Sequence, residues 1–130
     1  MSAENVELVR EGFRRLRGGN IEGALTLAAD DIEFLPLGAA LVEGRSYEGL
    51  AGLREWQREP AWDVRSDAME FHDFGHNVLV HGTITVVGAA SNAEIKTPVS
   101  WVVTVRADKI TRIEAFLDAE DATTAAHRSF

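Results

Sequence analysis

Residues 78–106, VLVHGTITVVGAASNAEIKTPVSWVVTVR, decide the fold of this chain. Val and Thr dominate both ends of the segment, and the small, turn-forming residues 89–92 divide it. Because β-branched residues favour strands and small polar residues favour turns, the segment predicts two long strands, at 78–88 and 94–106.

Strand signals continue on both sides of this segment. Residues 64–74 form another predicted strand, and Gly75-His76-Asn77 has the composition of a turn. Residues 110–117 form a fourth predicted strand, after a tight turn at 107–109. These four strands predict a meander, and residues 32–37 add an earlier apolar strand.

Helices are expected before the meander and after it. Apolar residues at helical spacing predict an N-terminal helix, and they are Val6, Val9, Phe13 and Leu16. Gly18-Gly19 would end that helix, and Asn20 would cap a second, short one. Residues 46–60 carry a third helical pattern, and Asp118 would cap a C-terminal helix over 119–127.

The order of these elements predicts the fold class. Helices first and a meander last favour the α+β class, with a curved antiparallel sheet that carries helices on one face. The length of 130 residues fits one hydrophobic core, so we expect a single domain over residues 1–130.

Composition excludes several kinds of function. The formal net charge is −8 and the basic residues do not cluster, so we expect no nucleic-acid partner. The chain contains no Cys, which excludes thiol chemistry and Cys-based metal sites. The charged N-terminus and the Val- and Thr-rich character of residues 77–93 predict no signal peptide and no membrane span, hence a cytoplasmic protein.

A set of short motifs runs in order along nearly the whole chain. They are VREGF at 9–13, GNIE at 19–22, ADDIEF at 29–34, YEGL at 47–50, RADKI at 106–110 and FLD at 116–118. Together they resemble the nuclear transport factor 2-like superfamily, in its SnoaL-like (polyketide cyclase-like) branch. The resemblance implies a cystatin-like, cone-shaped sheet that wraps around the N-terminal helices and encloses an apolar pocket. It also implies a homodimer that pairs through the outer face of the sheet.

The same resemblance allows the catalytic positions of ketosteroid isomerase relatives to be tested. By hand alignment, the family's oxyanion-donating tyrosine is replaced by Gly12 and its general-base aspartate by Leu35. The position of its second, protonated aspartate holds Trp101. Apolar side chains can neither accept nor donate a proton, so we expect this mechanism to be absent.

Strand alternation and the resemblance together predict the residues that line the pocket. The expected lining is apolar and aromatic: Phe13, Phe34, Leu35, Leu53, Trp56, Val80, Gly82, Trp101 and Val103. Trp56 and Trp101 have two readings, as simple core packing or as a stacking surface for a flat ligand.

The remaining candidates for chemistry are two histidines and one aspartate. His72 and His81 fall on strands expected to pair, which could bring them close to each other or to Glu70. Their shared outer face favours a role in a dimer or at the surface, and we expect no metal and no cofactor. Asp118 is the weak catalytic candidate, because a helix cap already accounts for it.

These observations leave two functions of different classes. In the first, the chain binds a small hydrophobic or aromatic ligand without converting it. In the second, it is a SnoaL-like isomerase, cyclase or hydrolase that uses a non-standard acid. A scaffold whose cavity is filled by its own side chains is a third, weaker reading. We also predict a homodimer, because the face that carries Thr83, Thr85, Val102 and Thr104 is β-branched and only weakly polar.

Overall fold

The computed structural model describes residues 2–18, 20–35, 47–57, 62–88 and 94–128. Within these ranges, side chains are described except at 2, 47, 53, 55–57, 62–69, 86–88 and 95. The described residues form one sheet of six strands in the order β2-β1-β6-β5-β4-β3, with helices on both of its faces.

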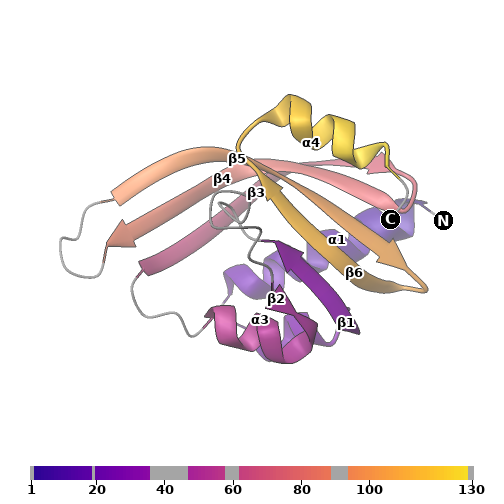
Figure 1. The fold of residues 1–130 in the computed structure, drawn as a ribbon, viewed down its shortest axis with the longest axis horizontal. Helices are drawn as coiled ribbons and strands as arrows, with labels where there is room; N and C mark the ends of the chain where they lie inside the picture. The colour runs from indigo at the N-terminus through magenta and orange to yellow at the C-terminus, as the bar shows by residue number, and fades with distance from the viewer. Residues whose placement is uncertain (1, 19, 36–46, 58–61, 89–93, 129–130) are drawn as a thin grey trace.

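The meander expected from the sequence forms the larger part of the sheet (Figure 1). It consists of β3 (Trp62–Phe74), β4 (Asn77–Gly88), β5 (Glu94–Arg106) and β6 (Lys109–Phe116), each antiparallel to the next. Short turns join β3 to β4 and β5 to β6, and a chain that reverses in a short turn can only pair antiparallel. The α+β class with its curved sheet is therefore confirmed.

One pairing departs from a purely antiparallel sheet. β1 (Ala28–Leu35) lies parallel to β6 and antiparallel to the two-residue strand β2 (Tyr47–Glu48). The whole meander separates β1 from β6 along the chain, so no turn dictates their relative direction. β1 also begins before the sequence predicted, because Asp30-Asp31 continues the strand instead of preceding it.

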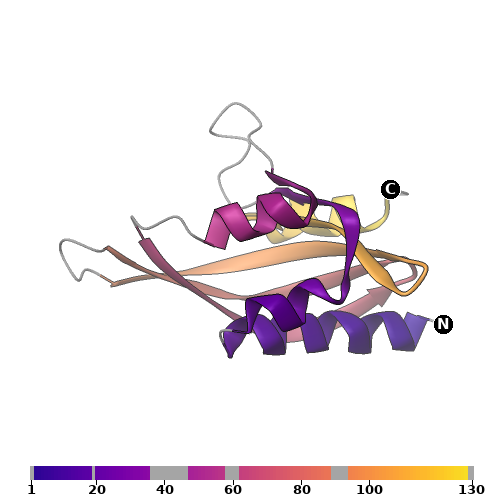
Figure 2. The same cartoon turned by 90° about the horizontal axis from the view of Figure 1, so that it is seen from below.

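In the part of the chain that the structure describes, four helices cover the sheet, and the sequence predicted each of them. They are α1 (Ser2–Arg17), α2 (Ile21–Leu25), α3 (Gly49–Gln57) and α4 (Ala119–Ala126). Residues of α1, α2 and α3 pack into the core on one face, which we call the inner face, and α4 packs on the opposite, outer face. The expectation of helices on one face only is therefore wrong, because the alanines of α4 find their own apolar partners, Leu79 and Val102, on the outer face. Figure 2 shows α1 running along the length of the strands.

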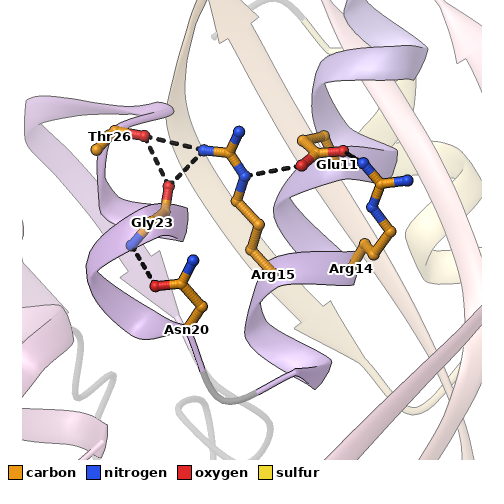
Figure 3. A network of polar contacts seen from close by, with 6 residues as sticks. All are labelled: Glu11, Arg14, Arg15, Asn20, Gly23 and Thr26. Atoms are coloured by element: carbon orange, nitrogen blue, oxygen red, sulfur yellow. Dashed lines mark hydrogen bonds and ion pairs between the residues drawn. The ribbon is translucent and has the colours of Figure 1, made fainter.

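A polar network fixes the junction between α1 and α2 (Figure 3). The Arg15 guanidinium donates to Glu11 Oε2 over 2.8 Å, to the Gly23 carbonyl over 2.8 Å and to Thr26 Oγ1 over 3.1 Å. Glu11 also pairs with Arg14. The hydrogen bond from Arg15 is the main cause that lowers the pKa of Glu11. Asn20 caps α2 by accepting from the Gly23 amide, and the sequence predicted this cap.

The two faces of the sheet bury different side chains. The inner-face core contains thirteen buried residues, and its largest side chains belong to Phe34 and Trp101. The outer-face core is smaller, because α4 places three alanines against Leu79 and Val102. Small residues let α4 lie close to the sheet.

A buried asparagine attaches α4 to the outer face. The Nδ2 of Asn77 donates to the Ala126 carbonyl over 2.9 Å and to the Arg128 carbonyl over 2.7 Å. Its Oδ1 accepts from Thr104 Oγ1 over 2.7 Å. Asn77 therefore satisfies two carbonyl groups at the C-terminal end of the helix, which would otherwise lack partners.

Candidate functional site

The inner face has an aromatic centre between α1 and the sheet. Trp101 of β5 is 5% exposed, and the ring of Phe13 from α1 meets it edge-on with the centroids 5.2 Å apart. Phe71 of β3 lies 6.1 Å from Phe13 in the same kind of geometry. Edge-to-face contacts of this kind are favourable for aromatic rings, so the three side chains form one apolar surface.

The structure brings together much of the lining expected from the sequence. Phe34, Val80, Trp101 and Val103 lie in the inner-face core, and the half-buried Phe13 packs against it. Gly82 pairs with Val99, whose side chain lies in this core, so both positions face the same way.

Three other expected lining residues lie elsewhere or are not described. Leu35 pairs with Glu114, whereas its neighbour Phe34 pairs with Ile113 of the inner-face core. Because side chains alternate along a strand, Leu35 lies on the outer face, apart from the rest of the set. The side chains of Leu53 and Trp56 lie outside the described residues, although their backbone forms part of α3.

Gly12 of α1 packs close to Ile110 of β6 and to Leu27. A Cβ atom at this position would meet Ile110 Cδ1 at 3.4 Å and Leu27 Cδ1 at 4.0 Å. One methyl group would just fit, but a tyrosine ring would displace both neighbours. The position that holds the tyrosine in ketosteroid isomerase relatives carries no side chain here, and no hydroxyl that could donate a hydrogen bond.

The histidines come together on the outer face. The rings of His72 and His81 meet edge-on with their centroids 5.4 Å apart. His81 Nδ1 lies 2.7 Å from Ser100 Oγ, and His72 Nε2 lies 3.6 Å from Glu70 Oε1. Glu70 lies opposite His81 in the β3–β4 pairing, so the four side chains share one face of the sheet. The sequence predicted that the two histidines would be close, but not the bond to Ser100.

Asp118 acts as the cap of α4. Its Oδ1 accepts from the Glu120 amide over 2.7 Å and from the Asp121 amide over 3.3 Å. The sequence favoured this role over catalysis, and the carboxylate is engaged with the helix rather than directed at the inner-face core.

An ion-paired group on the outer face was not predicted. Arg112 donates to Glu33 Oε1 and to Glu114 Oε1, each over 2.8 Å. Glu33 also borders an open groove of about 510 Å³ whose other lining residues are Asp31, Glu48, Gly49 and Thr111. The groove is acidic because Glu33 and Glu48 lie opposite each other on paired strands. No single sequence motif signals that these two residues pair.

The described ranges contain neither a cluster of metal ligands nor a helix suited to a membrane. No group of three or more His, Asp or Glu side chains there is arranged to hold a metal ion. None of the helices described is long and apolar enough to cross a membrane.

Comparison with known families identifies the fold. A family model described as a SnoaL-like domain matches residues 9–113. A sequence search of curated proteins gave no significant match.

Solved structures match over nearly the whole chain. TerC, co-crystallised with polyporic acid, is 25% identical with a TM-score of 0.77, over 96% of this chain and 99% of TerC. A nuclear transport factor 2-like protein from Burkholderia xenovorans is 25% identical with a TM-score of 0.73, over 97% of this chain and 98% of its own. An epoxide hydrolase from M. tuberculosis is 14% identical with a TM-score of 0.71, over 96% and 90% respectively. These proteins share the fold. The one activity described among them, that of the epoxide hydrolase, belongs to a protein only 14% identical to this chain, so the fold alone does not assign an activity.

Proposed function

The chain belongs to the SnoaL-like domain family, and on that premise we propose that it binds a small apolar or aromatic molecule at the inner face of its sheet. In this proposal the chain does not convert its ligand by the proton transfer that ketosteroid isomerase relatives perform. The cytoplasmic location expected from the sequence is part of the same proposal.

The observation that carries the proposal is the position of Trp101. Its indole packs against Phe13 among Val80, Val103 and other apolar side chains. An apolar ligand that displaced part of this packing would replace the contacts between side chains with contacts of its own to the same apolar groups. A flat ligand would also stack on the aromatic rings. Among the residues whose side chains are described, no buried one is ionisable. The Arg10 guanidinium lies 4.6 Å from the centroid of the Phe71 ring, at the aromatic centre of the inner face.

The alternative, an enzyme with a non-standard acid, has less support. Asp118 is engaged as a helix cap, and His72 and His81 lie on the outer face, where the sheet separates them from the inner-face core. A general acid or base must come within hydrogen-bond distance of the reacting group. None of these three side chains meets that condition for a ligand bound beside Trp101.

Ligand binding can be tested with a panel of hydrophobic compounds. The panel includes polyporic acid, steroids and flat aromatic acids, and binding is followed by the thermal unfolding midpoint and by tryptophan fluorescence. We expect at least one compound to raise the midpoint and change the emission. A panel without either effect would contradict ligand binding and favour an inner face filled by the chain's own side chains.

Two variants locate the site. Because the chain contains three Trp residues, Trp101→Phe identifies the share of the fluorescence change that comes from the inner face. Phe116→Leu is the matched control, since Phe116 packs against the outer-face core. We expect Trp101→Phe to reduce the fluorescence response and weaken binding, and Phe116→Leu to leave both unchanged.

We also propose that the chain forms a homodimer through the part of the outer face that α4 does not cover. Val102 and Thr104 lie fully buried beneath α4, and Thr85 is only 7% exposed. Of these four residues, the half-buried Thr83 is therefore the one that still offers surface to a second copy. Figure 1 shows β3, β4 and β5 extending past the end of α4. Sedimentation at micromolar concentration is expected to give a dimer, and a monomer there would contradict this proposal.

A further inference from the structure

A shallow groove with a few polar groups lies on the outer face of the sheet, beside α4. It has a volume of about 440 Å³, is open to solvent, and is lined by His81, Ala119, Glu120, Thr123 and Thr124. Val80, the residue before His81, lies in the inner-face core, so the sheet itself separates this groove from Trp101. A ligand here would occupy a second site, independent of the one proposed above.

The ring of His81 is held in a fixed orientation at the groove. Its Nδ1 is 2.7 Å from Ser100 Oγ, and Ser100 is only 5% exposed, on the strand that pairs with β4. When one imidazole nitrogen is engaged, the other is the atom that can meet a ligand. Among the described residues, Nε2 of His81 has no hydrogen-bond partner. Every buried side-chain polar atom that is described does have a partner, so Nε2 is in contact with solvent.

The other polar groups in the groove are mainly acceptors. Glu120 contributes a carboxylate, and the Thr123 hydroxyl already donates to the Ala119 carbonyl over 2.9 Å, which leaves its oxygen free to accept. No Lys or Arg is among the lining residues, and the chain carries a net charge of −8. A ligand that matches these groups carries positive charge and several N–H donors.

We propose that this groove binds a small protonated primary amine. Its ammonium group donates to Nε2 of His81 and to the carboxylate of Glu120, and the Thr123 oxygen accepts a third N–H. This arrangement requires the His81 tautomer in which Nδ1–H donates to Ser100 Oγ and the lone pair lies on Nε2. The neighbouring His72 stays paired with Glu70 and is not a ligand contact.

Ethylammonium chloride is the probe, and imidazole NMR signals are the readout. At about pH 8, free imidazole is neutral and primary amines are protonated. His81→Leu assigns the His81 signals, and thermal unfolding confirms that this variant folds. We expect ethylammonium to shift the His81 signals in a saturable way, with nitrogen shifts typical of the Nδ1–H tautomer. Tetramethylammonium, which has the charge but no N–H, is expected to shift them far less.

Two matched variants on α4 test the role of the carboxylate. Glu120→Gln removes a charge at the groove, whereas Asp121→Asn removes one from the next residue, which does not line it. Partly exposed ion pairs contribute up to about 1 kcal/mol, so Glu120→Gln is expected to weaken binding about two- to fivefold and Asp121→Asn to change it much less.

Three results would overturn the proposal. The first is an absence of saturable shifts at His81 up to about 0.1 M ethylammonium, well above the millimolar range of weak binding. The second is an equal response to tetramethylammonium, which would show a purely electrostatic effect. The third is equal weakening by the two α4 variants. Because Trp101 lies across the sheet, none of these results bears on hydrophobic ligand binding at the inner face.

Discussion

The two faces of the sheet are made from the same strands, yet they present opposite chemistry. On the inner face, β4 and β5 present Val80, Trp101 and Val103 to the helices that precede the meander. On the outer face, the same strands present His81 and Ser100, and β6 adds Arg112. Alternation along each strand is enough to separate the two sets.

This difference indicates where chemistry can and cannot occur in this chain. Several titratable groups described on the outer face are engaged with one another or with a helix end: Arg112 with Glu114, Asp118 as the cap of α4, and His72 with His81. The inner face offers apolar area and aromatic edges. Where ketosteroid isomerase relatives have a proton-donating aspartate, this chain has Trp101, which lies in the inner-face core.

Removing the aromatic centre of the inner face should have the largest effect. Trp101→Ala deletes a side chain that is 5% exposed and leaves a cavity beside Phe13. Large-to-small changes of this kind reduce the free energy of unfolding by about 3–5 kcal/mol. Urea denaturation measures the change. A loss below about 1 kcal/mol would mean that the inner face is not packed around this residue.

On the outer face, the attachment of α4 is the most sensitive point. Asn77→Ala leaves the carbonyls of Ala126 and Arg128 and the hydroxyl of Thr104 without their partner. Unsatisfied buried polar groups make this change cost about 2 kcal/mol in the free energy of unfolding. Thr104→Val, which removes only one of the three hydrogen bonds, is the control and should cost about half as much. Equal losses in the two variants would argue against Asn77 as the attachment of the helix.

The cap of α4 should contribute less. Asp118→Ala removes the acceptor for two amides of the first turn, which is expected to lower the free energy of unfolding by about 1 kcal/mol. Asp118→Asn keeps a good capping side chain and should restore most of the loss. If both variants bound ligand normally but abolished a conversion of that ligand, Asp118 would have a catalytic role that this account denies.

The smallest expected effect is a pH dependence at the α1–α2 junction. The hydrogen bond from Arg15 lowers the pKa of Glu11 below its ordinary value of 4.5. A carboxylate whose pKa is depressed in the folded state stabilises that state above 4.5 and loses this contribution as the pH falls through the lowered value. Urea denaturation of the wild type and of Glu11→Gln should therefore differ at neutral pH and converge in acid. A difference that persists unchanged in acid would assign the effect to packing.

Local signals were enough to predict most elements of the fold. The meander, the cap at Asn20 and the cap at Asp118 each depend on residues a few positions apart, so composition and periodicity specify them. The parallel pairing of β1 with β6 depends on where an edge strand packs in three dimensions. No pattern within either strand carries that information.

The candidate site was predictable to a similar extent. Alternation correctly grouped Val80, Trp101 and Val103, because these residues lie in the middle of long, regular strands. It was not applied to Leu35, which belongs to the outer face although Phe34 beside it belongs to the inner one. The contacts of His81 with Ser100 and of Asn77 with the end of α4 join distant segments, and only the folded structure brings them together.

The most direct test of the central claim monitors both faces of the sheet in one experiment. The indole N–H of Trp101 reports on the inner face, and the imidazole of His81 reports on the outer face. Titration with a hydrophobic ligand from the panel is predicted to shift the Trp101 signal in a saturable way and to leave the His81 signals in place. A ligand that shifts His81 and leaves Trp101 unchanged would contradict the claim that the inner face is the binding surface.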